Sequence, residues 1–428
     1  MSSRLASMWR GYWFEPAPLV NLATVRIVLV AYQLHRLLRH AILPTLIKRT
    51  ELPTDLYDPL PILRLMIGPV DWRYMPSAEV LEGIFWLTVI FGVLALVGLL
   101  TNLSLVVFTL GNVFMQSFIY SFGDYHHPEA LVMIALGTLA LSPSGGVLSL
   151  DSLWRRLREN ARTGRFRPLR VLEEKSAYAR WPLLLVMWVF ALIFLSAAYS
   201  KLRRGGLDWA NGYTLQYYLI SDALRGRKLD LGFWLGHQHF LAVLLSWFTL
   251  IFEATFFLVL VFPILAWIYV PAGIGFVLGL HVAMRATFFG YLAAYSVWVS
   301  WRALFARLGE AFQNRQRGGL EIRHESEARY PVPWLTLLSW ADCLQCLRFV
   351  EVREASSDPS LVPETRPVGR DTGGVRVAFE DGTPLSGIAA WRAVFRCVPL
   401  LWPPLALSYV PGAPGAAESV YGWFIRGT

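Results

Sequence analysis

Apolar runs of about twenty residues, the length that crosses a bilayer as a helix, recur between residues 17 and 305 of this chain. Only 16% of the residues are charged, against about 25% in soluble globular domains. The sequence therefore predicts an all-α polytopic membrane helical bundle over residues 1–310 and a separate domain over residues 311–428. The eight expected spans lie near residues 18–39, 79–100, 102–122, 128–147, 181–200, 239–261, 264–285 and 287–305.

Lysine and arginine gather in two segments, residues 154–180 after the fourth span and residues 302–317 after the eighth. Cytoplasmic loops of membrane proteins are enriched in these residues. Both segments should therefore lie on the cytoplasmic side. The expected location is a bacterial-type cytoplasmic (inner) membrane, with the N-terminus and the C-terminus both cytoplasmic. The net charge of +9 follows from this topology and requires no nucleic-acid partner.

This orientation brings several proton-handling side chains to the outer face. Lys201 ends the fifth span, and a lysine there can act as a base, although many such lysines only extend toward the headgroups. His127 and Glu129 lie in the loop before the fourth span, and His281 and Arg285 end the seventh. Further residues expected to line this site are Tyr199, Trp209, Tyr213 and His126.

Two charges fall inside predicted spans, Arg26 in the first and Glu253 in the sixth. An unpaired charge there costs roughly 2.5–3.5 kcal/mol, so we expect both to face the bundle interior and to pair with one another. A metal site is not expected, because no His-Glu-x-x-His or paired-carboxylate spacing is present.

Four segments resemble the horizontally transferred transmembrane domain family, which includes vitamin K-dependent γ-glutamyl carboxylase. The resemblance covers about the first 310 residues, and the order and spacing of the segments carry it. They are Leu22 to Val30; His127 leading into Leu141 to Gly145; Tyr199 to Leu202 followed by Asp208-Trp209-x-x-Gly212-Tyr213; and Leu244 to Trp247 followed by Glu253 and His281.

The resemblance implies an enzyme in which Lys201 deprotonates a reduced quinone, either vitamin K hydroquinone or menaquinol. O2 then converts the quinol to an epoxide, and the alkoxide formed can drive carboxylation of a glutamate by CO2. His127 would orient the quinol or the oxygenated intermediate, and His281 would line the pocket. No large outward-facing β-rich domain follows the spans, which puts carboxylation of a propeptide-bearing protein in doubt.

Two other functions stay open. A non-enzymatic relative would bind a lipid or peptide and assist the maturation or export of a partner protein. A transporter would be expected to contain an internal inverted repeat, and none is visible in the sequence.

The C-terminal segment resembles the small α/β thioredoxin-like domain of DCC type that is often fused to this family. Residues 347–352 would form its second strand, residues 375–380 a later strand, and residues 387–396 the following helix; residues 421–426 would form its closing helix. Cys343 and Cys346 would then lie between a helix and a strand, the reverse of a redox motif that opens a helix. A degenerate structural domain is favoured over a working dithiol, and Cys397 is expected to be a packed residue.

Overall fold

The structure is a computed structural model that describes residues 2–68, 75–123, 129–226, 231–315, 319–325, 332–352, 375–379, 383–385, 387–407 and 409. The chain divides into two compact units. Unit 1 comprises residues 1–17, 21–144 and 176–299, and unit 2 comprises residues 18–20, 145–175 and 300–428. This division differs from the predicted boundary at residue 310 because residues 145–175 group with the C-terminal residues.

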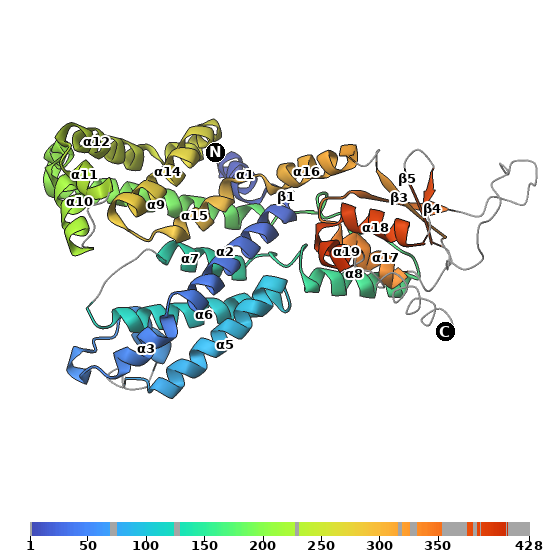
Figure 1. Cartoon of the computed structure of the whole chain (residues 1–428), viewed down its shortest axis with the longest axis horizontal. Helices are drawn as coiled ribbons and strands as arrows, with labels where there is room; N and C mark the ends of the chain where they lie inside the picture. Colours follow the sequence, from blue (N-terminus) through green and yellow to red (C-terminus); the bar gives the residue numbers. More distant parts are fainter. Residues whose placement is uncertain are drawn as a thin grey trace, which may run out of the picture. The chain divides into compact units, whose positions relative to one another are not determined.

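Helices dominate unit 1 (Figure 1). Its described α-helices are α1 (Ser2–Phe14), α2 (Leu19–Arg39, beginning in unit 2), α3 (Ile42–Thr50), α4 (Pro61–Ile67), α5 (Ala78–Val97), α6 (Thr101–Tyr120), α7 (Ala130–Ala140), α9 (Arg180–Gly205), α10 (Tyr213–Arg225), α11 (Leu231–Gly236), α12 (His239–Thr255), α13 (Leu258–Val261), α14 (Ala266–Met284) and α15 (Phe289–Ala294). Short 3₁₀ turns are η1 (Thr54–Leu56), η2 (Gly206–Asn211), η3 (Pro263–Leu265) and η4 (Tyr295–Trp298).

Five helical segments among the described residues are long and apolar enough to cross a membrane, which identifies the chain as a membrane protein. They are Ala78–Val97, Thr101–Tyr120, Arg180–Asn211, His239–Val261 and Pro263–Met284, and they correspond to five of the eight predicted spans.

The other three predicted spans differ from expectation. α2 covers the first as one helix, but its apolar sequence is interrupted by Arg26 and Arg36. The span predicted at 128–147 contains only the 11-residue α7. The span predicted at 287–305 is broken, because Val299 has an extended backbone (φ −80°, ψ 125°) that ends η4 before a new helix begins at Trp301.

An aromatic core holds α9, α12, α14 and η4 together. Phe190 on α9 packs 4.6 Å from Tyr295 between ring centroids, and Phe194 lies 5.2 Å from Phe252 on α12. Gly273 on α14 lies against Tyr295 so closely that a Cβ atom there would overlap the tyrosine hydroxyl. Edge-to-face and offset rings of this kind pack densely and exclude water.

Gly273→Ala should therefore destabilise unit 1 by about 1–3 kcal/mol through overpacking. Gly275→Ala is the matched control on the same helix, because its Cβ would meet open space; it should be neutral or stabilising by up to about 1 kcal/mol. Thermal unfolding of the protein in detergent micelles measures both. Equal unfolding temperatures for the two variants would contradict this packing.

Unit 2 contains a four-stranded sheet in the order β4-β3-β5-β6. β3 (Leu320–Glu325) pairs in parallel with β4 (Leu347–Val352) and antiparallel with β5 (Val375–Phe379), which pairs antiparallel with β6 (Pro384–Leu385). The helices of the unit are α8 (Leu150–Thr163), α16 (Trp301–Arg315), α17 (Val332–Ala341), α18 (Gly387–Cys397) and α19 (Trp402–Leu407), with η6 at Pro399–Leu401; β1 (Ala17–Pro18) and β2 (Lys175–Ser176) are two-residue strands.

The predicted strands at 347–352 and 375–380 and the predicted helix at 387–396 are confirmed as β4, β5 and α18. The closing helix predicted at 421–426 lies outside the described residues. α8 belongs to this unit because its Asn160 donates to Thr336 on α17 (2.8 Å), and Trp340 donates to the Ser149 carbonyl (2.9 Å).

Candidate functional site

The predicted base, Lys201, forms an ion pair inside unit 1. Its Nζ lies 2.8 Å from Oε1 and 2.6 Å from Oε2 of Glu253. The Glu253 side chain is only 6% exposed, whereas the Lys201 side chain is partly exposed. The predicted pair of Arg26 with Glu253 is therefore wrong: the partner of Glu253 is Lys201.

Local sequence explains this geometry. Ala242, Ser246, Leu250 and Glu253 are the inward-facing stripe of α12, at helical spacing. Leu250 packs with Ala198 of α9, and Lys201 follows one turn later. Because a helical side chain leans toward the N-terminus of its helix, Lys201 extends back along α9 toward Glu253.

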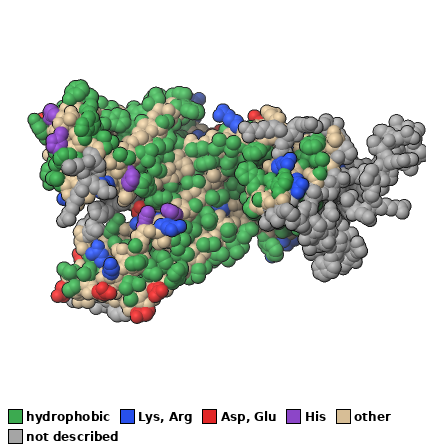
Figure 2. Space-filling model, viewed as in Figure 1, with side chains coloured by type: hydrophobic (Ala, Val, Ile, Leu, Met, Phe, Trp, Pro, Cys, Tyr) green, Lys and Arg blue, Asp and Glu red, His purple; other side chains and the backbone are tan. Residues whose placement is uncertain are grey.

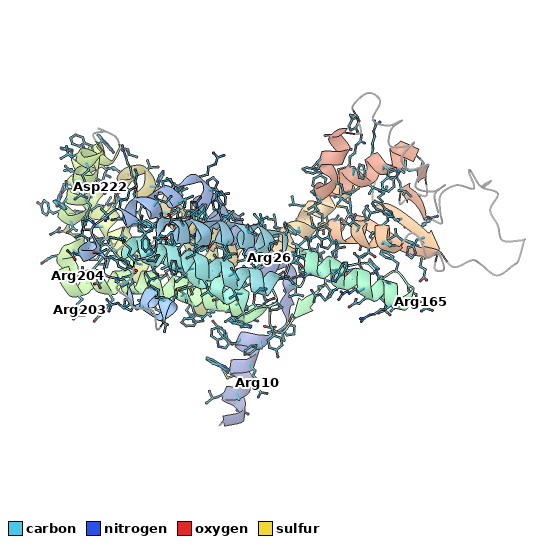
Figure 3. All side chains as sticks on the ribbon, turned by 90° about the horizontal axis from the view of Figure 1, so that it is seen from below. Arg10, Arg26, Arg165, Arg203, Arg204 and Asp222 are labelled. Atoms are coloured by element: carbon cyan, nitrogen blue, oxygen red, sulfur yellow. The ribbon has the colours of Figure 1, made fainter. Side chains whose placement is uncertain are left out.

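Trp209 covers the ammonium group. The Lys201 Nζ lies 5.2 Å from the centroid of the Trp209 ring, a cation–π distance. The tryptophan reaches this position because the chain turns at Gly206, whose φ of 57° favours glycine, into η2. Lys201, Glu253 and Trp209 thus form one site at the end of α9. In Figure 3, Arg203, Arg204 and Asp222 lie at this end of unit 1, whereas Arg26 lies far from it.

Arg26 has a different role from the one predicted. Its side chain is fully buried, and Nη1 donates to the carbonyl of Ser144 at 2.9 Å. Ser144 lies in the turn that follows α7. This hydrogen bond therefore fixes α2 to the end of α7 and supplies a partner for a charge in the helix interior.

Glu129, predicted to line the same pocket as Lys201, belongs to a second polar cluster. Its Oε1 lies 3.1 Å from Nε of Arg36, and Tyr32 donates to it at 3.3 Å. Arg36 also donates to Gln116 (2.8 Å), and Gln33 donates to Asn112 (2.6 Å).

The sequence did not lead us to predict this cluster, although it contains a pattern of polar residues that indicates one. Tyr32, Gln33 and Arg36 share one side of the first apolar helix, and Asn112 and Gln116 lie four residues apart on another. Polar groups repeated at helical spacing within apolar runs face one another, because lipid offers them no hydrogen-bond partner.

The remaining predicted residues that the structure describes do not join the Lys201–Glu253 pair. Tyr199 is 63% exposed and lies on the other side of α9, about 200° around the helix from Lys201. Tyr213 packs against His239, 4.6 Å between ring centroids. His126 and His127 lie outside the described residues.

His281 on α14 packs against Phe289, with 4.6 Å between ring centroids, and hydrogen-bonds neither Lys201 nor Glu253. Its Nδ1 is buried and makes no hydrogen bond within the described part of the chain. Arg285 ends α14 with a left-handed backbone, φ 54°, and its guanidinium lies against Gly226 after α10.

The cysteines of unit 2 lie between α17 and β4, as predicted. The carboxylate of Asp342 accepts hydrogen bonds from the backbone N–H groups of Cys346 (2.9 Å) and Leu347 (2.8 Å), which fixes the connection. Burial raises the pKa of Cys343 to about 11 and that of Cys397 to about 12, and it also raises the pKa of Cys346. Thiols with raised pKa values are poor nucleophiles near neutral pH.

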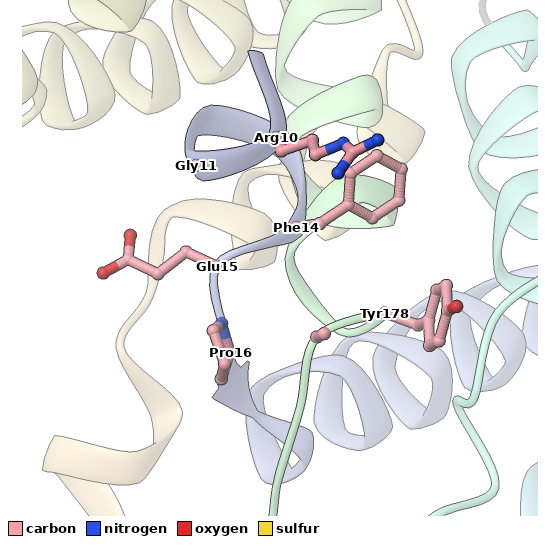
Figure 4. A pocket seen from close by; sticks show the side chains of 7 residues that line it. Arg10, Gly11, Phe14, Glu15, Pro16 and Tyr178 are labelled. Carbon is pink, nitrogen blue, oxygen red and sulfur yellow. The ribbon is translucent and has the colours of Figure 1, made fainter. Parts of the chain in front are cut away.

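A pocket elsewhere in unit 1 shares no residue with the Lys201 site (Figure 4). Its charged side chains, Arg10 and Glu15, point in opposite directions. Glu15 forms its ion pair with Arg180, which does not line the pocket. The pocket therefore offers no convergent polar groups for a ligand. It is lined by Arg10, Gly11, Phe14, Glu15, Pro16, Ala177 and Tyr178.

Comparison with known protein families, with curated proteins and with solved structures found no match to this chain. Within the described residues, no group of three or more His, Cys, Asp or Glu side chains could hold a metal ion.

Breaking the ion pair should destabilise unit 1. Lys201→Met leaves the Glu253 carboxylate buried without its partner, at a cost of about 3 kcal/mol. Glu253→Leu should have a similar cost, whereas the double variant should recover most of the loss because no uncompensated charge remains. Denaturant unfolding in detergent measures all three.

Arg203→Met, at an exposed position two residues along α9, is the control and should change the free energy of unfolding by less than about 0.5 kcal/mol. Additive effects of Lys201→Met and Glu253→Leu would show that the two side chains do not interact.

Alkylation tests the thiols. At pH 8, iodoacetamide should modify Cys343 of the folded protein about a hundredfold more slowly than the same residue in the unfolded chain, because the thiolate fraction falls about tenfold for each unit of pKa. Mass spectrometry of the two states gives the rates. Rapid modification of folded Cys343 would restore the redox interpretation.

Proposed function

We propose that unit 1 oxidises a reduced quinone, vitamin K hydroquinone or menaquinol, and that Lys201 and Glu253 together take up the quinol proton. The observation that carries the proposal is the Lys201–Glu253 ion pair, which keeps a proton acceptor beside a fixed positive charge in an apolar bundle. Ionisable groups within membrane helices typically mark proton and substrate sites.

The ion pair changes the role expected for Lys201. A lysine paired as an ammonium has no lone pair to accept a proton, whereas the Glu253 carboxylate can accept one. In the proposed step, the quinol hydroxyl proton passes through Lys201 to Glu253, and the ammonium stabilises the quinolate oxygen. Reaction with O2 then gives the quinone epoxide and water: one hydroquinone and one O2 yield one epoxide and one H2O.

The surroundings of Glu253 support a planar, apolar ligand. Phe252 precedes Glu253 and packs against Phe276 of α14, with 5.5 Å between ring centroids. Phe248 stacks on Phe252 at 5.7 Å. The Trp209 ring contacts the Lys201 ammonium of the pair through the cation–π contact. Aromatic faces of this kind bind flat rings by offset stacking.

For the C-terminal part of unit 2 we propose a degenerate thioredoxin-like domain of DCC type. The order β4-β3-β5-β6, with parallel β3 and β4 joined through α17, supports this fold. The buried thiols with raised pKa values support a structural role.

We also propose an inner-membrane location with both termini cytoplasmic. The arginines of α8 and of the segment that follows it support this orientation.

The direct test supplies membranes with vitamin K hydroquinone or menaquinol and O2, and follows the epoxide by chromatography. Wild-type membranes should form epoxide, and Lys201→Ala and Glu253→Gln should each lower the rate at least a hundredfold, the usual range for a lost acid–base group. Arg203→Ala should retain the wild-type rate.

Equal rates for wild type and Lys201→Ala would contradict the proposal. No epoxide in wild-type membranes would favour a non-enzymatic protein that binds a lipid or peptide. Adding labelled CO2 and a glutamate peptide to the same membranes tests coupled carboxylation, which should depend on Lys201.

A further inference from the structure

Helix α8 of unit 2 carries an exposed basic face. Trp154, Arg158 and Arg162 follow one another at four-residue intervals, which places them on one side of the helix. All three are exposed, Trp154 by 58%, and the Arg158 guanidinium lies 4.8 Å from the centroid of the Trp154 ring. Arg165, also exposed, lies at the end of the helix (Figure 3). These four residues are called the basic face.

The opposite side of α8 holds the helix in unit 2. Asn160 is buried there and donates to Thr336 of α17 at 2.8 Å. The N-terminus of the helix is capped by Ser149, which accepts a hydrogen bond from the backbone N–H of Ser152 at 3.0 Å. The contact with α17 and the cap therefore fix α8, and neither uses a residue of the basic face.

The positive charge of the basic face is largely uncompensated. Two neighbouring glutamates, Glu159 and Glu174, pair with Arg156 instead, at 3.2 and 3.1 Å. Within the part of the chain that the structure describes, the three arginines of the basic face form no ion pair. Asp151 lies on the same side in the first turn, so this side carries three arginines of the face against one carboxylate.

The position of α8 in the chain favours a membrane partner for this charge. Residues 141–149 link α8 to α7, an apolar helix of unit 1. Figure 2 shows hydrophobic side chains across the visible face of unit 1, as expected of a surface in contact with lipid. Basic clusters that follow a membrane segment closely typically bind anionic lipids. A nucleic acid or an acidic protein would account for the charge but not for its position beside a membrane segment.

We propose that the basic face binds the anionic headgroups of phospholipids, such as phosphatidylglycerol, at the surface of the membrane that contains unit 1. The guanidinium groups of Arg158, Arg162 and Arg165 contact the lipid phosphates. Trp154 lies at the level of the headgroups, where tryptophan rings are enriched. This binding is independent of the proposed quinol chemistry.

The test places a nitroxide label beside the basic face, at the exposed Ala161, through Ala161→Cys. The full-length protein is reconstituted in nanodiscs of phosphatidylcholine with or without phosphatidylglycerol, and protein without the added cysteine gives the background. With phosphatidylglycerol, the label should become less accessible to a water-soluble nickel complex and more accessible to O2, which concentrates in lipid. High salt should reverse the change, because it screens the attraction.

Variants of the basic face test the arginines directly. Arg158→Gln/Arg162→Gln should weaken the partitioning of the label into lipid about fivefold for each arginine removed, whereas Arg158→Lys/Arg162→Lys should retain it because the charge remains. Arg203→Gln/Arg204→Gln is the matched control, because it removes the same charge from exposed positions at the end of α9. It should behave like wild type, and thermal unfolding verifies that each variant is folded.

Equal accessibility of the label in both lipid mixtures would overturn the proposal, as would an equal response of wild type and Arg158→Gln/Arg162→Gln. Immobilisation of the label by polyuridylic acid or polyglutamate, without a response to phosphatidylglycerol, would also overturn it and would assign the face to a nucleic acid or to an acidic protein.

Discussion

A bilayer interior contains no water, so every charged side chain that an apolar helix carries inward has to find its partner within the protein. Three contacts within the described residues of unit 1 meet this constraint. Lys201 pairs with Glu253, Arg36 pairs with Glu129, and Arg26 donates to the Ser144 carbonyl. Each contact joins segments far apart in the chain, so these partners fix which helices lie side by side.

The constraint also bears on the chemistry proposed for the Lys201 pair. An ammonium and a carboxylate held 2.6 Å apart beside the aromatic rings of α12 and α14 interact more strongly than they would in water. A proton arriving at this pair meets an acceptor, and a developing negative charge meets a cation. The same arrangement serves stability and the proposed quinol chemistry, and the variants of Lys201 and Glu253 should therefore affect both.

Much of the fold could be predicted from the sequence, whereas the partners could not. The length of the apolar runs located five spans, and the alternation at residues 347–352 located β4. The inward position of Glu253 was also predictable from its apolar surroundings. Its partner was not, because helical periodicity gives the face of a residue but not which neighbouring helix lies opposite. The break at Val299 escaped prediction for a related reason: an apolar run has the same composition whether its backbone is continuous or bent.

The extent of unit 2 illustrates the same limit. Residues 145–175 look like an ordinary loop between two spans, yet Asn160 and Trp340 tie them to α17 through hydrogen bonds across more than 170 positions. Contacts of such long range leave no periodic pattern in the sequence. The placement of Cys343 and Cys346 between a helix and a strand was predictable because it depends on local order alone.

The most direct test of the central claim is an infrared difference spectrum, recorded without oxygen, of the membrane protein before and after addition of menaquinol. If the quinol proton moves to the Lys201–Glu253 pair, wild type should gain a carbonyl band of a protonated carboxylic acid, and Glu253→Gln should lack it. The absence of such a band in wild type, or its persistence in Glu253→Gln, would contradict the role of Glu253 as the proton acceptor.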